Sequence, residues 1–163
     1  MARSKLVIGF LGTQLDAGGG PKRWERWRPT VDLCRHEDWV VDRLVLFVDR
    51  AHTRLFEEIT KDIHSVSPET KVESVELGIT DPWDFEEVFA KLLDFSRQFT
   101  WRPEREDTFV HITTGSHVAQ ICLFLLSEAR YFPGKLLQTS PPRGREGKAM
   151  PGTLSVIDLD LSR

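Results

Sequence analysis

The sequence predicts an α/β domain of Rossmann-like architecture, with three layers built around one sheet. Short apolar runs of strand length alternate along the chain with segments whose apolar residues recur every three or four positions. Such alternation favours a parallel sheet covered by helices on both faces. The chain has 163 residues, of which 40% are hydrophobic and 29% charged, so it can bury a core of this size. We expect a single domain spanning residues 1–163.

Six segments have the composition of β-strands. Three are continuous apolar runs, which are typical of buried parallel strands: Lys5–Leu11, Arg43–Val48 and Phe109–Thr113. Polar and apolar residues alternate in Val72–Leu77, which favours a place near a sheet edge. The stretch between Leu136–Ser140 and Thr153–Leu159 is rich in proline and glycine and too short for a crossover helix. The prediction is therefore a mostly parallel six-stranded sheet with an antiparallel C-terminal strand pair.

Helices are predicted where apolar side chains repeat on one face, in residues 55–63, 85–99 and 118–129. Pro29 suits the first position of a further short helix that runs towards Glu37. For the helix of residues 85–99, we expect Asp81 to cap the N-terminus, Pro82 to be the first helical residue and Asp84 to complement the helix dipole.

Composition and charge exclude several classes of protein. A net charge of −3 argues against nucleic-acid binding through global electrostatics, although a local basic patch exists. Cys34 and Cys122 lack the paired spacing of a metal site, and we expect both to be reduced thiols. The N-terminus leads directly into a strand, and no apolar run reaches the roughly 20 residues of a membrane span. We expect a soluble, cytoplasmic protein with no membrane partner, no cofactor and no metal.

The loop after the first predicted strand, Gly12–Arg28, is an unusual segment. Its four glycines include three in a row, but it contains neither GxGxxG nor GxxxxGK[ST]. Cations then alternate with tryptophans; arginine forks suit phosphates, and indoles stack on bases. These residues are candidates for contacts with a nucleotide or single-stranded nucleic acid: Lys22, Arg23, Trp24, Arg26, Trp27 and Arg28. A mobile surface loop, with one or both tryptophans packed on the core, is the alternative.

The loop after the fourth predicted strand, Thr113–Gln120, should place a glycine and hydroxyls at a helix N-terminus. Free backbone N–H groups at such a terminus favour an anion. Thr114, Gly115, Ser116 and His117 are therefore candidate ligand contacts, with simple helix capping as the alternative. In open parallel sheets ligands bind beyond the carboxyl ends of the strands, where strand order reverses, and here that point falls between the first and fourth strands.

Two further groups are weaker candidates. Thr139 and Ser140 end the fifth predicted strand and could add hydroxyls to the same pocket. Arg143, Arg145 and Lys148 form a second basic cluster, although such a run in a turn is usually only solvated. The sequence contains no recognisable set of nucleophile, base and acid, so no catalytic residue is predicted.

The sequence resembles a known family over nearly its whole length. The stretches that carry the resemblance are VIGFLGTQLD, GPKRWERWRPTVDLCRHEDWVVDRL, VSPET, DPWDFEEV and EREDTFVHITTGSHVAQICLFLLSEARYFPGKLLQTSPP. Together they resemble the N-terminal domain of the RtcR family, bacterial sigma-54-dependent activators of the RNA-repair operon. That domain is a CARF domain, the CRISPR-associated Rossmann fold, so residues 1–163 would be one ligand-sensing domain excised from a longer AAA+ regulator.

The resemblance also implies a function and a site. CARF domains form two-fold homodimers and hold a ligand across the dimer face, and the RtcR domain is thought to sense RNA ends. The expected ligand is RNA with a phosphorylated or 2′,3′-cyclic phosphate end, such as a tRNA fragment, and binding would relieve repression of the AAA+ domain. By position, the resemblance adds these residues to the candidate contacts: Gly12, Thr13, Gln14, Leu15, Asp16 and Thr113. Gln120, at the end of the loop Thr113–Gln120, is a further candidate.

Three function classes stay open. The first is the non-enzymatic sensor described above. The second is a CARF ring nuclease or a domain that binds cyclic oligoadenylate. Many cyclic-oligoadenylate sensors carry a lysine near the place of His117, and its absence here favours a different RNA ligand. The third is a dimerisation domain without a ligand.

Overall fold

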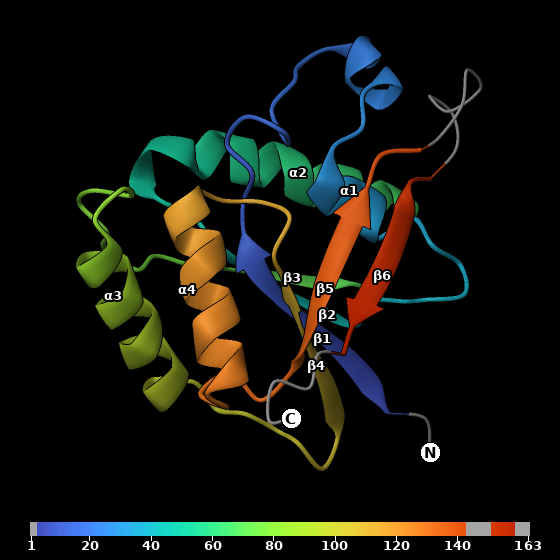
Figure 1. The fold of residues 1–163 in the computed structure, drawn as a ribbon. Coiled ribbons are helices and arrows are strands. Elements are labelled where there is room, and N and C mark those ends of the chain that lie inside the picture. The colour runs from blue at the N-terminus through green and yellow to red at the C-terminus, as the bar shows by residue number, and fades with distance from the viewer. Residues whose placement is uncertain (1–2, 143–150, 159–163) are drawn as a thin grey trace.

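The chain folds into a six-stranded mixed sheet, which confirms the predicted fold class (Figure 1). The computed structural model describes residues 3–142 and 151–158. The strands are β1 (Ser4–Phe10), β2 (Arg43–Phe47), β3 (Lys71–Val75), β4 (Glu106–His111), β5 (Lys135–Ser140) and β6 (Thr153–Ile157). Their order across the sheet is β3-β2-β1-β4-β5-β6, and only β5 and β6 pair antiparallel. Of the predicted last strand, Leu159 lies outside the described residues.

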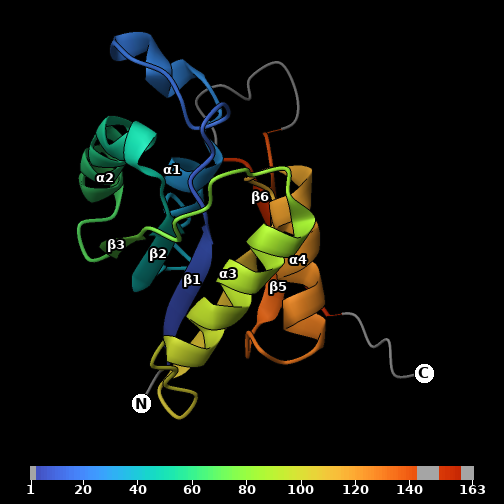
Figure 2. The same ribbon diagram turned by 90° about the vertical axis from the view of Figure 1, so that its left-hand side faces the viewer.

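Helices cover both faces of the sheet and give three layers (Figure 2). The longer helices are α2 (Thr53–Val66), α3 (Phe85–Gln98) and α4 (His117–Glu128), and three shorter ones are η1 (Pro21–Glu25), α1 (Pro29–Leu33) and η2 (Arg50–His52). The α3–α4 pair lies on one face and the α1–α2 pair on the other. The two faces share the strands through alternation, because neighbouring side chains of a strand point to opposite sides.

The central strand β1 shows this division residue by residue. Leu6 and Ile8 pack into the core beneath α3 and α4, whereas Val7 packs into the core with α1 and α2. All three side chains are fully buried, which explains why β1 is a continuous apolar run in the sequence. β3 lies at the sheet edge as predicted, but its burial does not alternate: Val72 packs on the core with α1 and α2, Val75 packs on the core with α3 and α4, and the two residues between them are exposed.

The start of α3 differs from the prediction. The helix begins at Phe85, and the cap is Asp84, whose side chain accepts a hydrogen bond from the Glu87 N–H at 3.2 Å. Asp81 and Pro82 belong instead to the preceding loop, where Asp81 accepts a hydrogen bond from the N–H of Trp83 at 2.9 Å. Several acidic residues in this segment are acceptable caps, and sequence alone does not choose between them.

The topology creates a crevice between β1 and β4. From β1 the chain continues to β2 and β3 on one side, and then crosses to β4 on the other side. Helices that follow the two central strands therefore diverge to opposite faces, which leaves their connecting loops side by side at the carboxyl edge of the sheet. A hydrogen bond joins these loops, because the Thr114 Oγ1 donates to the carbonyl oxygen of Phe10 at 2.6 Å.

Candidate ligand-binding cleft

A cleft of about 820 Å³ lies at the carboxyl ends of β1 to β4. Both loops singled out in the sequence contribute to its wall. From the predicted site residues, the lining includes Gly12, Thr13, Gln14, Leu15, Thr113, Thr114, Gly115, Ser116, His117 and Gln120. The structure thus brings together the halves of the site that lie about a hundred residues apart in the chain.

The loop before α4 is shaped by a cap and a glycine. Ser116 is the N-cap of α4, and its hydroxyl accepts a hydrogen bond from the Ala119 N–H at 3.1 Å. Gly115 has φ +96°, and a Cβ there would lie 3.1 Å from the Cβ of Phe10. Gln120 donates to the Gly115 carbonyl at 3.1 Å and so holds the turn from the helix side. The first-turn N–H groups of α4, which lack intrahelical acceptors, therefore end at the cleft.

The loop after β1 is held by Asp16, which is fully buried and does not line the cleft. Its carboxylate accepts hydrogen bonds from the Gly12 N–H at 2.7 Å, the Thr30 N–H at 2.9 Å and the Thr30 hydroxyl at 2.5 Å. Burial raises the pKa of Asp16 above its ordinary value, and these hydrogen bonds oppose that shift. Asp16 thereby fixes the turn that leaves Thr13 and Gln14 exposed at the cleft.

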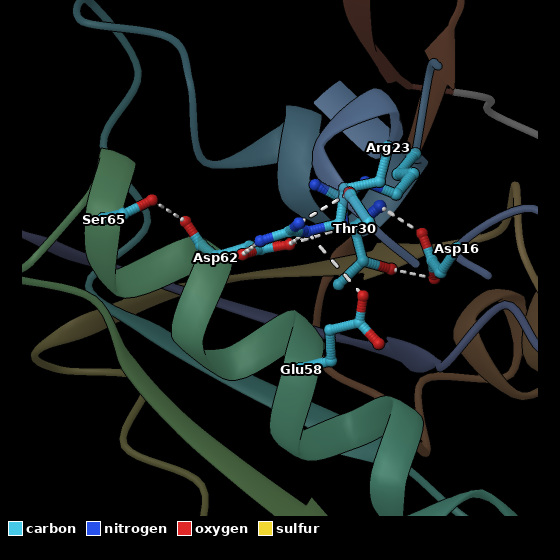
Figure 3. A network of polar contacts seen from close by, with 8 residues as sticks. Asp16, Arg23, Thr30, Glu58, Asp62 and Ser65 are labelled. Atoms are coloured by element: carbon cyan, nitrogen blue, oxygen red, sulfur yellow. Dashed lines mark hydrogen bonds and ion pairs between the residues drawn. The ribbon is translucent and has the colours of Figure 1, made fainter. Parts of the chain in front are cut away.

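A second carboxylate, Asp62 of α2, receives two of the predicted phosphate-binding arginines (Figure 3). Arg23 donates from Nε at 2.8 Å and from Nη2 at 3.1 Å, and the buried Arg28 donates from Nη1 at 2.6 Å. Burial raises the pKa of Asp62, but the hydrogen bonds and charges of the two arginines outweigh it and hold the pKa below its ordinary value. Arg23 and Arg28 thus join the loop to α2 rather than lining the cleft.

The two tryptophans of this loop also have structural partners. Trp24 packs against the core with α1 and α2, and the guanidinium carbons of Arg28 and Arg23 lie 4.9 and 5.7 Å from its ring centroid. Trp27 is half-buried, and its indole lies against the chain before β6, where a Cβ built on Gly152 would be 3.0 Å from the indole Nε1. The alternative that a tryptophan packs on the core is confirmed for Trp24.

The other predicted contacts that belong to the described residues lie outside the cleft lining. Lys22 and Arg26 are exposed on the β1–α1 connection, and the Arg26 guanidinium lies against Gly18. Thr139 is buried in the β4–β5 pair, where its hydroxyl bonds the His111 Nε2 at 2.8 Å. Ser140 ends β5 in register with Thr153 of β6. The basic cluster Arg143, Arg145 and Lys148 lies outside the described residues.

The cleft also has a wall that the sequence-based prediction missed. It comes from the loops after β2 and β3 and includes Asp49, Arg50, His52, Thr80, Pro82 and Trp83. His52 Nδ1 lies 2.6 Å from Asp49 Oδ1, and Arg50 forms an ion pair with Glu76 at 2.9 Å. The signal that could have found this wall is positional, because the carboxyl ends of all parallel strands meet at the same edge.

Within residues 3–142 and 151–158, no cluster of three or more His, Cys, Asp or Glu side chains has the geometry to hold a metal ion. The same residues contain no helix with the length and apolar character needed to cross a membrane.

The sheet order, its antiparallel last pair and the cleft at the switch point define a Rossmann-like α/β domain. The chain belongs to the RtcR family, described as regulator of RNA terminal phosphate cyclase, which matches residues 3–163. It is 56% identical over 162 residues to the transcriptional regulatory protein RtcR of Escherichia coli strain K12. That match covers 99% of this chain and 30% of the Escherichia coli protein, so the chain spans under a third of that relative.

Two solved structures share the fold at low sequence identity. Enterococcus italicus Csm6, bound to cyclic hexa-2′-fluoro-hexa-dAMP, matches with a TM-score of 0.64 and 17% identity, covering 97% of this chain and 42% of Csm6. Can2 from Sulfobacillus thermosulfidooxidans, in complex with cyclic tetra-adenylate, matches with a TM-score of 0.55 and 12% identity, covering 83% of this chain and 32% of Can2. At these identities the likeness shows the fold alone.

Proposed function

We propose that this chain is a sensor domain that binds an RNA end in the cleft between β1 and β4 and thereby controls a transcription regulator. The ligand is RNA with a phosphorylated or 2′,3′-cyclic phosphate end, such as a tRNA fragment. The observation that carries the proposal is the cleft of about 820 Å³ at the switch point, which combines exposed hydrogen-bonding side chains with the N-terminus of α4. A cleft of this size suits one or two nucleotides of an RNA end.

The chemistry of the two loops supports a phosphate ligand. The N–H groups of the first turn of α4 and the helix dipole favour negative charge. Thr13 and Gln14 are exposed on the opposite wall, where their side chains can donate hydrogen bonds to phosphate or ribose oxygens. Gly115 lets the turn adopt its left-handed conformation against Phe10 and Ala119, and so places the first turn of α4 at the cleft.

The family and the fold both point to nucleotides as the ligand class. A regulator of an RNA terminal phosphate cyclase has RNA ends as its natural signal, since these ends are what such a cyclase acts on. The structural neighbours Csm6 and Can2 were solved with cyclic oligonucleotides bound. A linear cyclic-phosphate end shares the phosphodiester and ribose chemistry of those ligands. Cyclic oligoadenylate is therefore the alternative ligand, and the binding assay below separates the two.

We also propose that the domain acts as a homodimer and restrains an AAA+ ATPase. The 70% of the Escherichia coli relative that this chain does not cover leaves room for such a domain. Three exposed apolar side chains, Leu15 beside the cleft and Ile121 and Leu125 on α4, offer a dimer face next to the ligand site. A ligand that binds one arrangement of the dimer more tightly than the other shifts the population and releases the ATPase.

The candidate contacts outside the cleft divide into two groups. Lys22 and Arg26 are exposed and can contact phosphates of a longer RNA further from its end. Arg23, Trp24 and Arg28 act indirectly, because they hold the loop to α2 and to the core. Asp16 acts in the same way through Thr30.

A non-enzymatic role fits the loop before α4 better than a ring nuclease does. The Ser116 hydroxyl accepts a hydrogen bond from the Ala119 N–H and donates one to the Pro82 carbonyl, both at 3.1 Å. Its proton is therefore held by Pro82 and is not directed at a ligand. Incubation of the pure protein with labelled cyclic-phosphate RNA and cyclic tetra-adenylate separates the two roles. Retained binding without turnover over hours supports the sensor, and product formation would establish the nuclease.

The central test compares RNA ends of identical sequence. Affinities are measured for oligonucleotides with a 2′,3′-cyclic phosphate, a 3′-phosphate and a 3′-hydroxyl, and for cyclic tetra-adenylate. We expect the phosphorylated ends to bind at least about tenfold more tightly than the hydroxyl end, because a hydrogen bond to a charged group contributes about 1.5–3 kcal/mol. Equal affinity for all three linear ends would contradict the proposal, and preferential binding of cyclic tetra-adenylate would establish the alternative.

Gln14→Ala tests the wall of the cleft in the same assay. We expect this substitution to lower the affinity for the phosphorylated ends about fivefold or more, because it removes one hydrogen-bond donor to the ligand and leaves the core unchanged. The matched control is Gln138→Ala on β5, an exposed glutamine outside the cleft lining, which should leave affinity unchanged.

A further inference from the structure

Trp83 is the most exposed large apolar side chain in the described part of the chain, at 65% exposure, and it lines the cleft. The other tryptophans, at positions 24, 27, 39 and 101, are all partly buried. We propose that Trp83 is the base-stacking residue of the cleft, which binds the nucleobase of a terminal nucleotide whose phosphate lies at the N-terminus of α4. This inference rests on the proposed function and adds the part of the ligand that the phosphate site does not recognise.

The loop that carries Trp83 is held rigidly from the helix behind it. The Glu87 carboxylate accepts hydrogen bonds from the Thr80 N–H at 2.9 Å, the Thr80 hydroxyl at 2.8 Å and the Asp81 N–H at 2.8 Å. Asp81 in turn accepts from the N–H of Trp83 at 2.9 Å. These hydrogen bonds hold the backbone up to Trp83, and on its other side the Asp84 N–H donates to the Asp81 carbonyl at 3.1 Å. A stacking surface that is fixed before binding costs little conformational entropy when the ligand arrives.

The same loop is tied to the proposed phosphate site. The Ser116 hydroxyl, at the N-cap of α4, donates to the carbonyl oxygen of Pro82, the residue directly before Trp83. This hydrogen bond joins the backbone that carries Trp83 directly to the N-terminus of α4. A nucleotide presents a phosphate and a base at the two ends of one ribose, so a wall that offers an anion site and an aromatic surface side by side suits a nucleotide better than an isolated phosphate.

Stacking on an indole would give the site little preference among bases. Every nucleobase has a π-face, so stacking contributes affinity with little sequence preference. Hydrogen-bond recognition of a base edge would instead demand dedicated polar groups. We therefore expect the site to discriminate strongly between end chemistries and weakly between terminal bases.

The experiment pairs a variant with a ligand that lacks the base. Binding of an RNA with a 2′,3′-cyclic phosphate end is compared with binding of the same RNA whose terminal nucleotide is abasic but keeps the cyclic phosphate. Trp83→Ala should lower the affinity for the complete RNA by about five- to hundredfold, and should change the affinity for the abasic RNA by less than about twofold. Trp83→Phe should restore most of the affinity for the complete RNA, because it keeps an aromatic face. Tyr131→Ala, which removes an exposed aromatic residue outside the cleft, is the matched control.

Each other result overturns the inference in a recognisable way. Equal losses of affinity for both RNAs would show that Trp83 has a structural role. Unchanged affinity of Trp83→Ala for the complete RNA would show that Trp83 does not contact the ligand, while the proposed function would still stand. If Trp83→Ala changes the oligomeric state and not the base-dependent affinity, the indole belongs to a protein contact. If the unchanged protein distinguishes no RNA end, the proposed function fails, and this inference fails with it.

Discussion

At the scale of single residues, His111 shows how the core of this fold uses a polar side chain. It lies on the central strand β4, fully surrounded by protein, and its Nε2 lies 2.8 Å from the Thr139 hydroxyl on the neighbouring strand β5. Burial lowers the pKa of His111 from 6.5 to about 4, because a charged imidazole is poorly solvated there. His111 is therefore neutral at physiological pH and contributes to packing.

This shift predicts a pH dependence of stability. The unfolded chain takes up the imidazole proton near pH 6.5 and the folded chain only near pH 4, so the contribution of His111 is complete above pH 6.5. As the pH falls from 6.5 towards 4, the free energy of unfolding decreases by up to about 3 kcal/mol because protonation of His111 favours the unfolded chain. His111→Gln, which cannot titrate, should flatten the fall between pH 6.5 and 4 in denaturant titrations. If the free energy of unfolding falls equally with pH in both proteins, folding does not lower the pKa of His111.

Single residues also mark where sequence-based prediction stops. The loop Gly12–Arg28 was expected to bring arginines to a phosphate, yet Arg23 and Arg28 pair with Asp62 on α2. Nothing in the local pattern of the loop indicates a carboxylate more than thirty residues further along the chain, because that partner is chosen by tertiary packing. Trp83 was missed for the opposite reason, since a short segment between a strand and a helix gives no periodicity from which exposure can be predicted.

At the scale of elements, α4 ends in a complete Schellman motif. The Tyr131 N–H bonds the Leu126 carbonyl at 2.9 Å, and the Arg130 N–H bonds the Ser127 carbonyl at 3.1 Å. Arg130 has φ +68° and is the only residue other than glycine with a positive φ in the described part of the chain. Glycine is the usual residue at this position, since a Cβ disfavours the left-handed conformation.

Arg130→Gly should therefore stabilise the protein. We expect the free energy of unfolding to rise by about 0.5–1 kcal/mol, because relief of the left-handed strain exceeds the extra flexibility that glycine gives the unfolded chain. Ala129→Gly is the neighbouring control: Ala129 has φ −80°, so glycine there brings only the entropic cost and should lower stability. Denaturant unfolding of both variants at the same pH checks the pair. Destabilisation of equal size in the two variants would contradict this account.

The elements themselves were predictable because each pattern had a strong physical cause. Continuous apolar runs identified the buried parts of β1, β2 and β4, although β4 begins at Glu106, three residues before the predicted start, and the polar residues of β3 indicated its place at the sheet edge. The breaker-rich link indicated the antiparallel β5–β6 pair. The N-terminus of α3 was misplaced by a few residues, because Asp81 and Asp84 are equally good caps and the decision comes from Glu87, which draws Thr80 and Asp81 into a loop.

At the scale of the whole molecule, α4 connects the proposed ligand site to an exposed apolar surface. Its N-terminus lines the cleft, whereas Ile121 and Leu125, one turn apart, are 50% and 41% exposed. Leu15, on the facing wall of the cleft, is 44% exposed. Exposed apolar side chains such as these favour contact with another protein surface. A second copy of the chain is the occupant that fits the proposed function, because a two-fold axis beside the cleft lets one ligand contact both protomers.

Leu125→Lys tests this dimer face. In a two-fold interface each substitution occurs twice, so two charges would enter an apolar contact, and we expect dimer affinity to fall at least about tenfold. Sedimentation equilibrium over a range of concentrations measures the change, and denaturant unfolding confirms that the fold is retained. Val156→Lys on β6, where the native side chain is 40% exposed and outside the cleft lining, is the matched control and should leave dimerisation unchanged. A greater loss of dimer affinity in Val156→Lys than in Leu125→Lys would show that the dimer forms through the β6 edge. A protein that stays monomeric in the presence of ligand would remove α4 from the proposed mechanism, because release of the ATPase then could not depend on two domains changing their arrangement.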